Sequence, residues 1–461
     1  MRKWLWRLTL ASFVVLVLIA LAYVGALRLL RGSLAQLDGR RELPGLSAPA
    51  TISRDINGTV TIDAASEADA MRALGFVHAQ ERYFEMDLMR RSAAGELAEL
   101  VGDAALATDK RHRVHRLRAR VEAGMASIVG EKGAVLDAYV NGVNAGLDAL
   151  RARPWPYLLL RQSPLHWRAE DSPLVAYAMY FDLQGGEDAD ALALWRMRPY
   201  LPKEIYALLT RDGSRWDAPL QGAPRGDAAL PEAYEVQLGS LPAATGLPAR
   251  TEPAGAPGSN QFAVAGPLTR DRRALLANDM HLTLRAPNIW FRARLRYPDP
   301  AAPGGKVDVQ GLTLPGLPLV VAGSNGHIAW GFTNSYVDTM DWKVETPCDT
   351  RRTDGCASLS SHLEMIEVAN GKLAAVEVQE TEWGPVLATL PDGRVLTLRW
   401  VAHLPGAVNL GLGRLATAAD VDAALAMADD IALPTQNLML ADSKGGIAWR
   451  LLGPIPQRAE T

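Results

Sequence analysis

The segment Gly258-Ser259-Asn260-Gln261-Phe262-Ala263-Val264 decides how this chain is interpreted. It starts a strand-like run directly after a stretch between about Leu230 and Gly258 that is rich in Pro, Gly, Ala and Thr. We expect that stretch to be an exposed connector of the kind that proteases reach. If the bond before Ser259 were cut, this residue would carry a hydroxyl nucleophile and a free α-amino group, whose ordinary pKa of about 7.7–8.0 suits a base near neutral pH. Taken alone, a Gly-Ser pair at the start of a strand is usually structural.

The patterns on the two sides of this junction differ. Upstream, helical periodicity is predicted over 67–100, 134–150 and 172–194, after a hairpin over 51–62 whose turn is Asp55-Ile56-Asn57-Gly58. Downstream, short apolar or alternating runs separated by turn residues predict strands near 261–266, 274–277, 289–297, 307–309, 319–322, 327–332, 373–380 and 394–401. A helix-rich first half and a strand-rich second half predict an α+β layered fold.

Composition and missing motifs exclude several classes of protein. The 461 residues are 48% hydrophobic and 21% charged, which rules out a disordered or collagen-like chain. The net charge of -3 gives no reason to expect a nucleic acid as partner. Ser324 lacks the Gly-x-Ser-x-Gly context because Ala322 stands where the first glycine should be, and neither a His-Glu-x-x-His helix nor a phosphate-binding loop occurs. The nucleophile elbow of an α/β-hydrolase, a conventional zinc site and a conventional nucleotide-binding site are therefore excluded.

The amino terminus predicts export. Arg2, Lys3 and Arg7 precede an uncharged apolar run over 8–27, which Arg28 and Arg31 close. About 20 apolar residues match the thickness of a bilayer, and positive charge at the start favours a cytoplasmic end. The sequence predicts an inner-membrane anchor facing the periplasm; the alternative is a signal peptide cleaved near Ala20-Leu21-Ala22, with release to the periplasm.

The two cysteines fit an oxidising compartment. Cys348 and Cys356 bracket a polar stretch that we expect to be a loop closed by one disulfide, with two unpaired thiols as the alternative. A metal site there is not expected, because no His or further Cys lies at ligand spacing.

Two basic features upstream of the junction are open to a structural or a functional interpretation. The run from Lys110 to Arg120 predicts a solvated helix face, with contact to anionic lipid as the alternative. His78 lies in a helical apolar pattern and is expected to be a hydrogen-bonded core histidine.

Ordered blocks along most of the chain resemble the penicillin acylase (penicillin amidase) family of N-terminal nucleophile hydrolases, which includes cephalosporin and acyl-homoserine-lactone acylases. The blocks cover 76–100, 258–282, 314–318, 325–334, 434–442 and 453–458. The resemblance implies a four-layer αββα core and a zymogen that cleaves itself after Gly258 into an alpha/beta chain heterodimer. It implies hydrolysis of a linear amide, either the acyl side chain of a β-lactam, as in antibiotic metabolism, or an N-acyl homoserine lactone, without an organic cofactor.

The same resemblance assigns roles to individual residues. Ser259 would be the nucleophile and, with Gly258, would form the cleavage site. The side-chain amide of Asn437 and the backbone N–H of Asn334 would stabilise the oxyanion. His281 would orient the serine amine, and Arg458 would hold that amine and Asn437 in place.

A structural calcium ion is a further implication of the family. The segment Asp338-Thr339-Met340-Asp341 resembles the family's calcium loop, with Asp338 and Asp341 as carboxylate ligands and Met340 as a carbonyl ligand. The ligand from the first chain would be Glu187, with Asp188 as the alternative. A simple Asx turn at a strand end would explain the same segment without a metal.

The resemblance divides the chain into four parts. They are an anchor or signal with a linker (1–42), a helix-rich first chain (43–229), a spacer (230–258) and a strand-rich catalytic chain (259–461). Gln261-Phe262 departs from the polar residue and tryptophan that are common after the nucleophile. The catalytic chain ends sooner than is usual in the family, so we expect its carboxy-terminal part to be missing. The alternative function is therefore a truncated, non-catalytic, membrane-anchored remnant that does not process.

Overall fold

The computed structural model describes residues 2–185, 187–211, 213–219, 222–230, 258–349 and 354–458, without the side chains of Lys3, Glu187 and Asp188. The predicted spacer at 230–258 lies almost wholly outside these residues.

The α-helices are α1 (Arg2–Gly32), α2 (Glu67–Ala94), α3 (Leu97–Val101), α4 (Asp103–Arg113), α5 (Leu117–Val129), α6 (Gly133–Asp148), α7 (Trp155–Leu160), α8 (Asp171–Gln184), α9 (Glu187–Met197), α10 (Lys203–Leu209) and α11 (Val421–Ala428). The strands are β1 (Thr51–Arg54), β2 (Val60–Asp63), β3 (Gly258–Val264), β4 (Leu275–His281), β5 (Phe291–Pro298), β6 (Lys306–Thr313), β7 (Val320–Ser324), β8 (Ile328–Asn334), β9 (Met340–Glu345), β10 (Ser360–Val368), β11 (Lys372–Glu380), β12 (Val386–Thr389), β13 (Val395–Trp400), β14 (Gln436–Asp442) and β15 (Ile447–Leu452).

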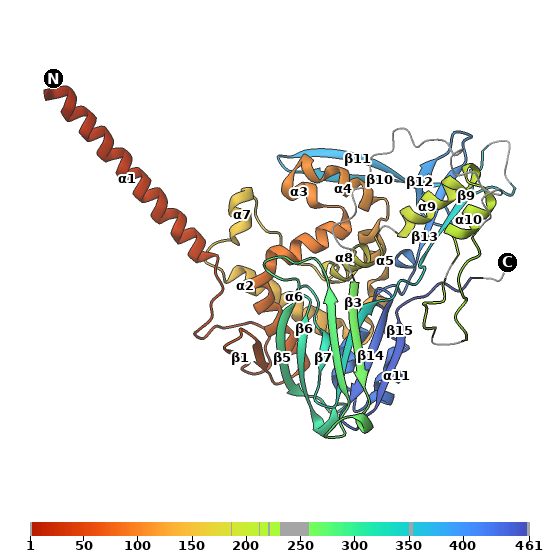
Figure 1. Ribbon diagram of the computed structural model, residues 1–461. Coiled ribbons are helices and arrows are strands. Elements are labelled where there is room, and N and C mark those ends of the chain that lie inside the picture. The colour runs from red at the N-terminus through yellow and green to blue at the C-terminus, as the bar shows by residue number, and fades with distance from the viewer. Residues whose placement is uncertain are drawn as a thin grey trace.

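An eight-stranded sheet forms the centre of the molecule, in the order β1-β2-β5-β6-β7-β8-β14-β15. The pair β2–β5 is parallel, and the other neighbours in this sheet are antiparallel. The hairpin β3–β4 pairs only with itself among the described strands and lies against β8 and β14. Figure 1 shows α2, α6 and α8 gathered against the upper part of the strands, so helix and sheet share one core, and the predicted mixed α+β class is confirmed.

Two of the predicted helices are interrupted by glycines. The helix predicted over 67–100 begins at the N-cap Ser66, whose side chain accepts a hydrogen bond from the Asp69 N–H. It ends at Gly95, where φ is 67° and an added Cβ would lie 2.7 Å from the carbonyl oxygen of Asp109. The helix predicted over 172–194 likewise divides at Gly185 into α8 and α9. Both predicted ranges are therefore helical, and in each of them a glycine ends the first of two helices.

His78 is a core residue, as predicted. Its Nδ1 lies 2.8 Å from the Tyr139 hydroxyl and its Nε2 lies 2.9 Å from Thr313 Oγ1. Complete burial lowers the pKa of His78 to about 3, so the ring is neutral in the fold. These bonds join α2 and α6 to the end of β6.

The basic run at 110–120 is a solvated helix face at Lys110 and Arg111, which are exposed on α4, and that prediction was wrong for the rest of the run. Arg116 Nε lies 2.9 Å from Glu364, and its Nη1 lies 3.0 Å from Glu380, on the hairpin β10–β11. Arg120 pairs with Glu380 as well. These arginines are mostly buried because they join α4 and α5 to the second half of the chain.

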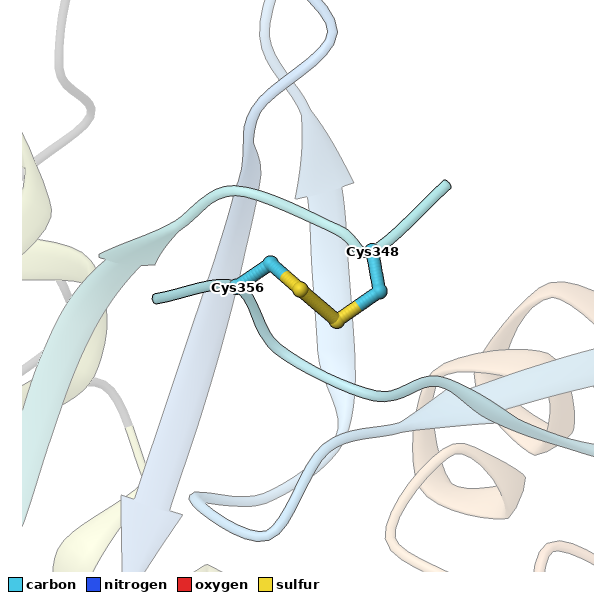
Figure 2. The surroundings of a disulfide bond; sticks show 2 residues. All are labelled: Cys348 and Cys356. Atoms are coloured by element: carbon cyan, nitrogen blue, oxygen red, sulfur yellow. A yellow bond between two sulfur atoms is a disulfide. The ribbon is translucent and has the colours of Figure 1, made fainter. Parts of the chain in front are cut away.

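Two predicted features outside the central sheet are present. Cys348 and Cys356 form a disulfide (Figure 2), which confirms the pairing. The apolar run at the amino terminus is one continuous helix that projects from the body (Figure 1) and is long and apolar enough to cross a membrane from Trp4 to Gly32. The length and the composition of this helix alone give it that property.

Candidate active site

Ser259 lies near the start of β3, on a hairpin that is joined to the central sheet through side chains. Within the hairpin, Ser259 is opposite Met280 and Gly258 is opposite His281. Ser259 is half-buried and lines a partly open, mainly apolar cavity of about 90 Å³. Placement at this cavity gives Ser259 access to a bound apolar group.

Asn278 fixes the hairpin on β8. Its side-chain oxygen accepts a hydrogen bond from the Phe332 N–H at 3.1 Å, and its amide nitrogen donates to the Phe332 carbonyl at 2.8 Å. Gly331 permits this approach, because a Cβ there would lie 2.6 Å from the Asn278 oxygen. The paired bonds satisfy backbone groups of β8 and set the position of the β3–β4 hairpin, which carries Ser259.

The two asparagines predicted to bind the oxyanion are neighbours. Asn437 is opposite Thr333 and beside Asn334 in the β8–β14 ladder. The Asn437 side-chain amide donates to the Asn334 carbonyl at 3.0 Å and to Thr333 Oγ1 at 3.2 Å. Asn334 also lines the same cavity as Ser259. The fold thus brings three of the predicted residues to one region, with the Asn437 amide engaged by protein acceptors.

His281 lies beside the predicted cleavage site. A Cβ placed on Gly258 would lie 3.7 Å from His281 Nδ1. On its other side, the ring places Nε2 2.9 Å from Asp279 Oδ2. The imidazole is about half exposed, with Asp279 on its Nε2 side and Gly258 on its Nδ1 side.

Arg458 contacts neither Ser259 nor Asn437 among its hydrogen bonds. Its Nε lies 3.0 Å from Asp341 Oδ1, and an Nη nitrogen lies 3.2 Å from both the carbonyl and the carboxylate of Asp338. Hydrogen bonding to Asp341, together with both carboxylates, raises the pKa of Arg458. The guanidinium therefore neutralises the two carboxylates that were predicted to bind calcium.

The described residues alone do not make a calcium site. Asp338 and Asp341 offer hard oxygen donors and line one cavity together with Met340 and with Asp190 of α9. Among the described residues, however, no group of three or more His, Cys, Asp or Glu side chains is close enough to hold a metal. The side chain of Glu187 lies outside the described set, so the predicted ligand group is not tested.

The cavity beside Ser259 is apolar on most sides. Its wall includes Met280 and Leu282 from the hairpin, Phe332 from β8, Met179 from α8 and Leu410 from the loop after η6 (Val401–His403). Residues that are far apart in the sequence thus line one cavity beside the Ser259 hydroxyl.

The comparison with known sequences gives the family. The profile of the family described as penicillin amidase matches residues 49–461. This chain belongs to the penicillin amidase family.

Several characterised relatives in the penicillin amidase family are similar along nearly all of this chain. Penicillin acylase 2 proenzyme from Pseudomonas sp. (strain SE83) is 32% identical over 443 residues, which cover 93% of this chain and 55% of that protein. The acyl-homoserine lactone acylase QuiP from Pseudomonas aeruginosa is 28% identical over 451 residues, covering 93% of this chain and 52% of that protein. The chain therefore spans about half the length of the relatives it matches.

Similarity to a solved structure is more limited. Penicillin G acylase from Alcaligenes faecalis overlaps 43% of this chain and 36% of its own, at 21% identity and a TM-score of 0.38. That overlap is too small for a conclusion about the fold.

Three residues of this candidate site received no role from the sequence. Asn278 and Asp279 lie in the block 258–282 that resembles the family, and Gln261 belongs to the pair that departs from the family pattern. Gln261 Nε2 donates to the Asn437 carbonyl at 3.2 Å. Alternation along the strand could have placed Gln261 on the same face as Ser259, but its partner on β14 depends on the tertiary fold.

Proposed function

We propose that this chain is the precursor of an N-terminal serine amidohydrolase that hydrolyses a linear amide. The single observation that supports it best is the position of Ser259, the second residue of β3, at a mainly apolar cavity that Asn334 also lines. Cleavage of the bond between Gly258 and Ser259 would free the serine amine and yield an alpha/beta heterodimer with a four-layer αββα core. His281 lies beside that bond and would orient the new amine.

The proposed reaction has two halves. The Ser259 hydroxyl attacks the amide carbonyl carbon while its own amine, through a water molecule, takes the hydroxyl proton. The C–N bond then breaks, the leaving amine takes up that proton, and the acyl group stays on Ser259 as an ester. Water attacks the ester with the same amine as base, which releases a carboxylic acid and restores the hydroxyl.

Oxyanion stabilisation is assigned to Asn437 and Asn334. In each half, negative charge develops on the carbonyl oxygen and requires donors aimed at it. The Asn437 amide would exchange a protein acceptor for this oxygen, since it donates to Asn334 and Thr333 in the free structure. The role of Arg458 in holding the serine amine and Asn437 stays a prediction, as does the calcium site of Asp338, Met340, Asp341 and Glu187.

The acyl group of the substrate is proposed to be apolar. Leu282, Phe332 and Met179 offer hydrocarbon and aromatic surface to a group attached at Ser259. Both the acyl side chain of a β-lactam and the chain of an N-acyl homoserine lactone meet this requirement. Relatives carry names from both groups of acylase.

The proposed location is the outer face of the inner membrane, with α1 as an uncleaved anchor. A disulfide at Cys348 and Cys356 suits an oxidising periplasm. A cleaved signal that releases the body to the periplasm is the alternative.

Intact-mass analysis of the purified chain tests the proposed processing. We expect two fragments, one ending at Gly258 or losing part of the spacer and one beginning with Ser259, and we expect Ser259→Ala to remain whole. A panel of acyl amides that differ in acyl length then tests the activity of the processed protein. A chain that stays intact and leaves all amides unhydrolysed would instead support the non-catalytic remnant, which the acylase names of the relatives do not favour.

A further inference from the structure

The end of α1 is attached directly to the segment that precedes α7. The backbone N–H groups of Arg151 and Ala152 both donate to the Gly32 carbonyl at 3.1 Å. Gly32 is so close that a Cβ on it would lie 3.0 Å from the Ala152 Cβ. Ser33, the next residue, is buried. The apolar helix is therefore docked on the body at this point, and Figure 1 shows α7 beside the end of α1.

The short helix α7 is held to the core by one side and exposed on the other. Tyr157 is fully buried, and its hydroxyl donates to Asp87 Oδ2 of α2 at 2.5 Å. Trp155 and Leu159 point outward and are 52% and 74% exposed. A fixed helix that presents a tryptophan and a leucine to solvent has an apolar face without a partner among the described residues.

Residues that follow α1 extend this face. Leu34 and Leu37 are exposed and, with Trp155, line one groove of about 680 Å³. We call Leu34, Leu37, Trp155 and Leu159 the α7 patch. The patch thus combines two segments that lie next to the end of the apolar helix.

Basic residues border the α7 patch. Arg28 and Arg31 are in the last turns of α1, and Arg151 and Arg161 flank α7. Glu81, Glu85 and Arg285 line the same groove. Arginine next to exposed tryptophan and leucine is the composition of a membrane–water interface, where the rings sit at headgroup level and cations meet phosphate.

We propose that the α7 patch inserts into the outer interfacial layer of the same bilayer that α1 spans, with Arg151 and Arg161 at anionic headgroups. This membrane contact is separate from the proposed amidase function, and it depends on α1 remaining as an uncleaved anchor. At a 1.5 Å rise per residue, the 29 residues from Trp4 to Gly32 extend about 44 Å, which matches the roughly 40–45 Å of a bilayer with its headgroup regions. Because Gly32 is bonded to the segment before α7, the patch must lie at the headgroups when α1 spans the bilayer. The body would then be held at one orientation rather than on a free tether.

Depth-dependent quenching in nanodiscs tests the α7 patch on the full chain. Both native cysteines form the disulfide, so Leu159→Cys supplies the single thiol for an environment-sensitive fluorophore. Leu268→Cys is the matched control, because Leu268 is 81% exposed and lies between β3 and β4. This position is at the opposite end of the β3–β4 hairpin from Ser259. In discs of phosphatidylcholine and phosphatidylglycerol, spin-labelled lipid should quench the Leu159→Cys label at least threefold more than the control.

Three outcomes would overturn the proposal. Equal quenching at both sites would show that the α7 patch stays in water. A shifted emission at Leu159→Cys without quenching by lipid would show that protein, such as a second copy, covers it. If protein isolated from membranes lacked the residues before Tyr23, α1 would have been cleaved as a signal peptide, and the α7 patch would not be held at the bilayer. Amide hydrolysis and cleavage at Ser259 are measured on the same samples, so failure of the amidase hypothesis is seen separately.

Discussion

Gln261 donates a hydrogen bond from Nε2 to the backbone carbonyl of Asn437 at 3.2 Å. This bond connects the strand of the proposed nucleophile to the strand of the proposed oxyanion donor, 176 residues apart in the sequence. Gln261 lies two positions after Ser259 on β3, so both side chains are on the same face of the strand. Gln261 is therefore placed to set the distance between Ser259 and Asn437.

Replacing Gln261 with Met should lower turnover more than it lowers substrate affinity. Loss of a hydrogen bond of this kind costs about 0.5–1.5 kcal/mol, which corresponds to a two- to tenfold lower kcat if the bond positions Asn437 for the transition state. Steady-state kinetics on a hydrolysed amide would measure the effect, with Phe262→Leu on the exposed face of the same strand as control. A raised KM at unchanged kcat would contradict the positioning role.

Replacing Asn437 with Ala should separate processing from turnover. An oxyanion donor typically contributes about 3–4 kcal/mol, so kcat should fall by roughly 10²–10³. Cleavage before Ser259 should be less affected, as judged by the fraction of intact chain on a mass spectrum. Equal losses of processing and turnover would argue against a dedicated oxyanion role and for a structural one at the β8–β14 ladder.

Local sequence was sufficient for the features that depend on neighbouring residues. The hairpin of β1 and β2 formed as predicted because Asp55 accepts hydrogen bonds from the N–H groups of Asn57 and Thr59 within the turn. Ser259 likewise lies in a strand, β3, which begins at Gly258. The disulfide was predictable because Cys348 and Cys356 are eight residues apart.

Contacts between distant segments were not predictable in the same way. Arg458 bonds to Asp341 across 117 residues, and nothing local to either residue indicates the partner. Strand β14 was not predicted, and its pairing with β8 depends on the order of strands in the sheet. Helix breaks at Gly95 and Gly185 were missed because the apolar period continues through them.

Replacing Gly331 with Ala should destabilise the hairpin on β8. The new methyl group would lie 2.6 Å from the Asn278 oxygen and force it away from Phe332, at a cost of about 1–3 kcal/mol. Thermal unfolding followed by circular dichroism would report a lower Tm. Gly124→Ala is the control, because its nearest neighbour is 3.7 Å away within α5 and a helical alanine is favoured.

A double-mutant cycle checks the cause of that loss. In an Asn278→Ala background the clash is gone, so Gly331→Ala should cost much less than it does alone. Additive losses would show that Gly331 matters for a reason other than Asn278.

Two buried histidines should make the fold sensitive to acid. His115 Nδ1 lies 2.9 Å from His403 Nε2, and this bond connects the proposed first and second chains. Burial lowers the pKa of His115 to about 3, and burial together with His115 and Arg120 lowers the pKa of His403 well below 6.5. Below pH 6.5 the unfolded state therefore binds protons that the folded state does not, so stability is full above that pH and falls as the pH decreases toward 3. Each histidine contributes about 1.4 kcal/mol per pH unit, which gives a loss of about 2–3 kcal/mol between pH 7 and pH 5.5 for the pair.

Urea unfolding of wild type and of the double variant His115→Gln/His403→Gln measures this dependence, because glutamine keeps a hydrogen-bonding amide and does not titrate. The variant should start less stable at pH 7 and lose about 2–3 kcal/mol less than wild type on going to pH 5.5. His78 is unchanged in both proteins, so its own acid sensitivity cancels in the comparison. If the two proteins lost stability in parallel, the folded pair would have to take up protons near pH 6, and the neutral, buried arrangement of His115 and His403 would be wrong.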